Sequence, residues 1–219
     1  LLLAYVALRQ GDALGFCSFA SDQRRFLAPA KGPAQLNVLL NGVYDLVNTR
    51  QPADFTQAAV QVLAQQKRRA LVVILTNLRD EDDEDLLGAV RLLASRHRVL
   101  VVSLREPVLD ALRQRPVTRL QEALDYCGTL DYLTARERLH DRLLARGVPV
   151  LDALPQALGP ALISRYLAWR GGDPAAAQAE IEGPLAVILG AQAEDWSDYR
   201  LPDLAQLRMP EFLAALGSQ

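Results

Sequence analysis

The run of residues 71–75, Leu-Val-Val-Ile-Leu, most constrains the fold that this chain can adopt. A strand with one solvent-exposed face alternates apolar and polar residues, whereas this run is apolar throughout. Such a run is typical of a strand buried on both faces, as in a parallel sheet covered by helices. It ends in Thr76 and Asn77, which are polar. In open parallel sheets, binding groups gather beyond the carboxyl ends of the strands, so this point is a candidate site.

Strand-like and helix-like segments alternate through most of the chain. The strands expected besides the central run lie at 13–20, 24–27, 98–104 and 148–151, and Pro149 favours an edge position for the last one. Helical spacing predicts helices at 1–9, 33–47, 55–66, 107–114 and 158–169, one ending at 95, and a long one at 118–146 that Gly128 could interrupt. This alternation predicts an α/β fold with a doubly wound, mostly parallel sheet flanked by helices.

Composition excludes several function classes. The 219 residues carry a formal net charge of −2, which does not support nucleic-acid binding. No apolar run approaches the roughly 20 residues that span a bilayer. Cys17 and Cys127 are expected to be reduced, core-filling thiols. The chain starts at Leu1 inside an apolar pattern, so we expect a fragment of a parent that could be membrane-anchored, located in the cytoplasm or at the cytoplasmic face of the membrane.

Polar side chains outside the strand end have plain structural interpretations. His97 and His140 lack partners at metal-ligand spacing and are expected to be structural or exposed. The acidic cluster 80–85 indicates a solvated helix start, with a cation or a basic partner as the alternative. Arginines recur at helical spacing with acidic residues between them, which indicates a solvated face or a docking face for an acidic partner; they are Arg136, Arg138, Arg142 and Arg146.

Several stretches, taken in order, resemble one protein family. Five stretches are similar to motifs of von Willebrand factor A-like domains, in the bacterial branch called domain of unknown function fifty-eight. They are residues 11–19, 68–78, 92–104, 143–151 and 162–169. The resemblance covers residues 1–170 and implies a von Willebrand factor A-like domain whose first strand is missing from this chain. Residues 171–219 match nothing recognisable and form a C-terminal extension, with helix-like segments at 175–182 and 210–216.

The resemblance also implies a metal site. Such domains often hold Mg²⁺ or Ca²⁺ with an Asp-x-Ser-x-Ser loop, a Thr and an Asp, and a partner's carboxylate completes the shell. Here the loop is absent, and the other positions correspond to Asp54, Thr56 and Asn77. We therefore expect a degenerate site that binds metal weakly or not at all, with Thr76, Asn77 and Asp80 contacting a partner. Asp54 could instead be a simple helix cap, and Thr76 and Asn77 could be strand-end turn residues.

The missing first strand would leave a slot between strand 13–20 and strand 71–76. Unpaired backbone groups in a buried slot are costly, so some segment should fill it. One hypothesis is that Leu185–Leu189 does so, from this chain or a neighbouring copy, within an extension that packs on or completes the sheet. The alternative is a part of the parent outside this sequence.

The favoured function is a non-catalytic protein-interaction module. The family resemblance implies a MoxR-type AAA+ ATPase as partner, in assembly or maturation. The alternative is a metal-assisted hydrolase that uses Asp54, Asn77 and the acidic loop, and a third possibility is a structural scaffold. We expect no catalytic residues and no organic cofactor.

Overall fold

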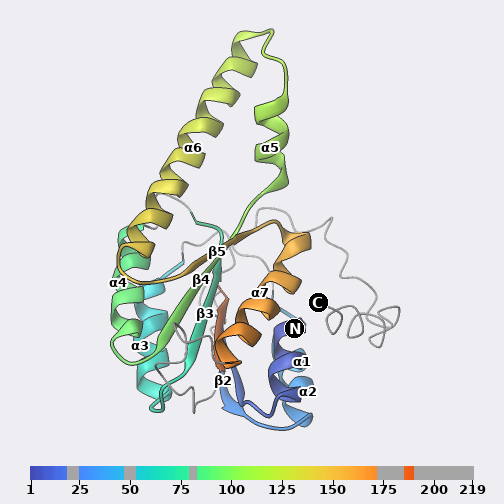
Figure 1. The fold of residues 1–219 in the computed structure, drawn as a ribbon, viewed down its shortest axis with the longest axis vertical. Coiled ribbons are helices and arrows are strands. Elements are labelled where there is room, and N and C mark those ends of the chain that lie inside the picture. The colour runs from blue at the N-terminus through green and yellow to red at the C-terminus, as the bar shows by residue number, and fades with distance from the viewer. Residues whose placement is uncertain (19–24, 47–52, 79–82, 172–184, 190–219) are drawn as a thin grey trace, which may run out of the picture.

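A six-stranded sheet with helices on both faces forms the body of the protein (Figure 1). The computed structural model describes residues 1–18, 25–46, 53–78, 83–171 and 185–189. The strand order is β2-β1-β6-β3-β4-β5. The strands are β1 (Leu14–Ser18), β2 (Arg25–Ala30), β3 (Leu71–Thr76), β4 (Arg98–Leu104), β5 (Val150–Ala153) and β6 (Leu185–Leu189).

The sheet is mostly parallel, as the sequence predicts. Strand β2 pairs antiparallel with β1, and every other pairing is parallel. Strand β6 lies between β1 and β3, with Val187 opposite Phe16 on one side and Val73 on the other. The slot that the resemblance leaves empty is thus occupied by Leu185–Leu189 of this chain, whereas the predicted helices at 175–182 and 210–216 lie outside the described residues.

Two layers of helices cover the sheet. The helices are α1 (Leu2–Arg9), α2 (Ala34–Val43), α3 (Phe55–Gln65), α4 (Asp83–Ala94), α5 (Pro107–Gln114), α6 (Leu120–Leu144) and α7 (Pro155–Arg170). One buried cluster joins one face of the sheet to α3, α4 and the last turns of α6, and the other joins the opposite face to α1, α2 and α7. None of these helices is long and apolar enough to cross a bilayer.

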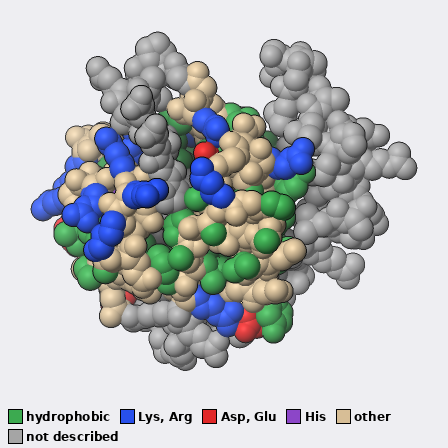
Figure 2. Space-filling model, turned by 90° about the horizontal axis from the view of Figure 1, so that it is seen from below, with side chains coloured by type: hydrophobic (Ala, Val, Ile, Leu, Met, Phe, Trp, Pro, Cys, Tyr) green, Lys and Arg blue, Asp and Glu red, His purple; other side chains and the backbone are tan. Residues whose placement is uncertain are grey.

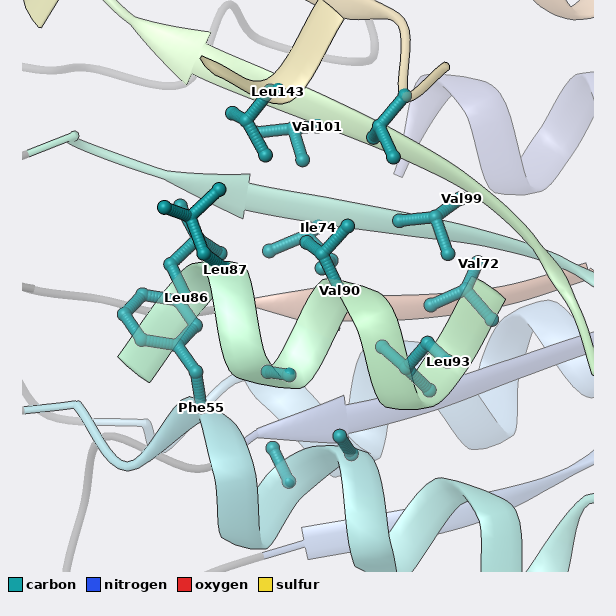
Figure 3. Close-up of a cluster of buried hydrophobic side chains, with 14 of the residues drawn as sticks. Phe55, Val72, Ile74, Leu86, Leu87, Val90, Leu93, Val99, Val101 and Leu143 are labelled. Carbon is teal, nitrogen blue, oxygen red and sulfur yellow. The ribbon is translucent and has the colours of Figure 1, made fainter. Parts of the chain in front are cut away.

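Strand β3 is buried on both faces, which confirms the central prediction. Val72 and Ile74 belong to the cluster beneath α4, and Figure 3 shows them pointing toward the α4 side chains. Leu71 and Val73 belong to the cluster on the opposite face. Both faces of the strand are covered by helices, which accounts for the lack of a polar residue in the strand before Thr76.

The predicted edge strand β5 lies at one edge of the sheet, and β2 forms the other. Among the described strands, β5 follows Pro149 and pairs only with β4, and β2 pairs only with β1. Pro29 lies within β2, where an edge position tolerates a residue without an N–H group. Gly15 of β1 permits the close approach of β2, because a Cβ atom there would lie 2.8 Å from the Pro29 Cγ.

Helices α5 and α6 form a hairpin that extends beyond the carboxyl ends of the strands (Figure 1). Helix α6 has 25 residues and continues through Gly128, where the sequence allowed a break. At 1.5 Å per residue it is roughly 38 Å long. Gly147 follows it with a positive φ of 73°, the conformation that ends helices. Helix α5 has no buried residue.

Two predictions about α6 are wrong. Cys127 is exposed on the projecting half of the helix, so it does not fill a core, although Cys17 is buried as expected. Arg136 does not belong to a solvated face: its side chain is 3% exposed and its Nη2 bonds Asp152 of β5 at 2.8 Å. A carboxylate from the edge strand compensates this charge, because α6 crosses the sheet beside β5.

Candidate functional site

The carboxyl edge of the sheet gathers the residues that the sequence singles out. Strands β1, β3 and β4 are parallel members of one sheet, so they end at this edge, where α4 and α5 begin after β3 and β4. Helix α3 also begins there, because its first residues bond the start of α4. The site is therefore built from helix starts and strand ends, where backbone N–H and C=O groups need partners.

Asp54 is the N-cap of α3. Its carboxylate accepts a hydrogen bond of 2.8 Å from the backbone N–H of Gln57. This bond satisfies one of the backbone donors that every helix start leaves free. The alternative weighed for Asp54, a helix cap, thus accounts for its side chain in the structure.

Asp85 joins the starts of α3 and α4, a structural role that the sequence analysis missed. It lies in the first turn of α4, yet it accepts hydrogen bonds from the N–H groups of Phe55 at 2.7 Å and Thr56 at 3.2 Å, and from the Thr56 hydroxyl. The interpretation of this segment as a solvated helix start is therefore wrong for Asp85. No local signal reveals the contact, because the partners are 29 and 30 residues apart.

The end of β3 is covered. Thr76 is 4% exposed, and its hydroxyl donates to the carbonyl of Asn77 at 3.2 Å. The Asn77 side chain is half-buried, and its Nδ2 donates to Oε1 of Glu106 at 3.4 Å. The carbonyl of the next residue, Leu78, accepts a 2.9 Å bond from the Tyr132 hydroxyl of α6. Within this turn, Asn77 presents more surface than Thr76.

The predicted site residues divide between two junctions. Asp54 and Thr56 bond within the α3–α4 junction, whereas Asn77 bonds Glu106 after β4. Asp80 lies outside the described residues. Among the residues that the structure describes, no group of three or more His, Cys, Asp or Glu side chains could hold a metal ion. Two of the three expected ligands are thus held by helix-start hydrogen bonds.

The rim of this edge carries acidic side chains. Arg142 of α6 bonds Asp83 at 3.1 Å and also bonds Glu84, whose side chain remains 86% exposed. Glu106 is also exposed. At the far end of the edge, the hydrogen bond from Arg25 holds the pKa of Asp45 below its usual value. The rim thus exposes the carboxylates of Glu84 and Glu106, and α6 is attached to it through Arg142 and Tyr132.

These features define a mixed α/β domain with a mostly parallel sheet, exposed carboxylates at its carboxyl edge and a helical hairpin beyond that edge. A sequence model of the family described as "Protein of unknown function DUF58" matches residues 1–140, so the chain belongs to this family. No curated protein matches the chain.

Proposed function

We propose that this chain is a non-catalytic protein-binding module of the von Willebrand factor A-like type. Its contact surface is the acidic carboxyl edge together with the α5–α6 hairpin. The observation that carries the proposal is the exposure of large apolar side chains on the hairpin: Leu120 is 77% exposed, Leu124 58%, Val108 54% and Val117 49%. Apolar side chains gathered on a projecting arm are typical of a binding surface.

The hairpin and the rim suit one partner together. Tyr132 and Arg142 join α6 to the turn after β3 and to the start of α4. A partner seated against the hairpin would therefore also meet Glu84 and Glu106. Apolar contacts would supply the affinity, and the acidic rim would favour a basic partner and set its orientation.

The family resemblance supports a MoxR-type AAA+ ATPase as the partner, in assembly or maturation. We further propose that binding does not depend on Mg²⁺ or Ca²⁺. Asp54 and Thr56 would have to give up their hydrogen bonds at the start of α3 to become ligands. The hydrolase alternative gains no support from these contacts, because the same bonds engage Asp54.

Binding to a purified MoxR-type ATPase from the same source, measured by calorimetry, tests the proposal. The double variant Leu120→Asp, Leu124→Asp should weaken binding at least about tenfold, because charge replaces the apolar contact. Val60→Asp is the matched control, because Val60 is 54% exposed on α3, away from the hairpin. Unchanged binding by the double variant would overturn the hairpin contact. Loss of binding after chelation of divalent metal would overturn metal independence.

A further inference from the structure

A groove of about 410 Å³ lies at the amino edge of the sheet, opposite the edge that carries the acidic rim. The end of α4, the first residues of β4, the loop before β5 and the last two turns of α7 form its walls. Its polar lining comes from His97, Arg98, Arg146 and Arg165, and Trp169 adds an aromatic wall. These residues come from four separate elements, so only the folded chain forms the groove.

Within the part of the chain that the structure describes, the charge of the groove is uncompensated. None of the described lining residues is acidic, and no ion pair among the described residues includes Arg98, Arg146 or Arg165. Arg146 donates to the carbonyl of Arg142 at 2.9 Å, and the Arg165 guanidinium lies 5.8 Å from the centre of the Trp169 ring. These neutral contacts position the guanidinium groups without cancelling their charge. An anion in the groove would be attracted by all three of these charges.

His97 is a buried polar side chain in the lining. It is 3% exposed, and neither ring nitrogen has a hydrogen-bond partner among the described residues. Burial, with a contribution from the charge of Arg96, lowers its pKa, which favours the neutral ring with one N–H donor and one acceptor nitrogen. The unpartnered N–H is a further donor in the groove lining.

The surroundings have the same sign. Lys67, Arg68 and Arg69 lie just before Ala70 and β3, at the same edge of the sheet. Figure 2 shows Lys and Arg side chains gathered on the lower face of the molecule, with few acidic side chains among them. The chain as a whole has a net charge of −2, so this edge is basic against the overall balance. The field at this edge favours the approach of an anion.

We propose that this groove binds a phosphate-bearing small molecule, with Arg98, Arg146 and Arg165 contacting its phosphoryl oxygens. Guanidinium groups match phosphate oxygens with paired hydrogen bonds. The groove volume lies within the range of small-molecule sites, roughly 300–1,000 Å³. The concave shape and the three arginines in its lining suit a compact, multiply charged anion better than an extended polymer. The site is independent of the protein-binding surface proposed above.

Inorganic triphosphate, titrated by calorimetry at constant ionic strength, is the probe. We expect saturable binding, with each of Arg98→Gln, Arg146→Gln and Arg165→Gln weakening it by about tenfold or more. Arg91→Gln is the matched control: Arg91 is exposed on α4, lies outside the groove lining and should leave binding within about twofold of the wild type. Arg146 and Arg165 are exposed, so their variants keep the test valid even if Arg98→Gln fails to fold.

Three outcomes would overturn the proposal. The first is no saturable binding of triphosphate in the millimolar range. The second is an equal loss in Arg91→Gln, which would indicate a general charge effect. The third is tight binding of a single-stranded oligonucleotide that depends on the same arginines while triphosphate fails to bind, which would assign the groove to a polymer. A shift of the His97 ring resonances on addition of triphosphate would support the assignment independently.

Discussion

Asp85 joins the starts of α3 and α4, two helices that β3 separates along the chain. Its carboxylate accepts hydrogen bonds from the first N–H groups of α3 while it occupies the first turn of α4. Two helix starts therefore share one acidic side chain. Gly88, one turn further along α4, lies beside the Thr56 hydroxyl, and a Cβ atom there would make only an ordinary contact of 3.9 Å with it.

Asp85→Asn should destabilise the fold by about 1–3 kcal/mol, because an amide cannot accept all three hydrogen bonds and carries no charge at the helix starts. Urea unfolding measures the change. Glu84→Gln is the control: it lies in the same first turn, but its side chain is 86% exposed, and its ion pair with Arg142 should contribute at most about 1 kcal/mol. Equal effects of the two variants would contradict the shared cap.

The lowered pKa values of the two histidines should make the folded state less stable in acid. Burial is the main cause that lowers the pKa of both His97 and His140, with added repulsion from Arg96 and Arg136 respectively. Below the usual histidine pKa of about 6.5, the unfolded chain therefore binds more protons than the folded chain. Stability should fall as the pH drops from about 6.5 toward the folded-state pKa values. Unfolding free energies measured across this window should decline less steeply in His97→Leu, and an unchanged slope would contradict the prediction.

At the scale of elements, α6 consists of two halves with different surroundings. Leu139 and Leu143 lie in the core beneath β4 and β5, whereas Leu120 and Leu124 project on the hairpin. Tyr132 marks the transition, because its hydroxyl reaches the carbonyl of Leu78. The first half therefore owes its helical form to its own hydrogen bonds and to α5, while packing on the sheet holds the second half.

Substitutions in the two halves should differ in cost. Leu139→Ala should destabilise the fold by about 2–5 kcal/mol, because it opens a cavity in a buried cluster. Leu124→Ala should change the free energy of unfolding by less than about 0.5 kcal/mol, because Leu124 is 58% exposed. Chemical denaturation of both variants measures the difference. A large cost at Leu124 would mean that the hairpin packs against another part of the chain.

At the scale of the whole molecule, β6 links the two halves of the sheet. Strands β1 and β2 lie on one side of it, and β3, β4 and β5 lie on the other. The charge of the molecule is also divided, because the carboxyl edge has exposed acidic side chains and the amino edge has the arginine-lined groove. The two binding surfaces proposed above therefore lie at opposite edges of the sheet.

Val187→Pro tests the central place of β6. Val187 pairs with Phe16 on one side and Val73 on the other, so proline would remove a backbone donor from the middle of the sheet. We expect a loss of about 3 kcal/mol or more in unfolding free energy. Pro29, which β2 accommodates at the edge, shows that position rather than proline itself decides the cost. An unchanged unfolding midpoint would contradict the placement of β6.

The sequence by itself determined the order of the elements, the double-sided burial of β3, the edge position of β5 and the cap at Asp54. These features follow from local periodicity and local hydrogen bonding, which neighbouring residues specify. Only the tertiary structure decided the shared cap at Asp85, the burial of Arg136 against Asp152, the exposure of Cys127 and the arginine-lined groove. All four have the same physical reason. Each depends on which elements pack against one another in the folded chain, and residue spacing within one element does not specify that packing.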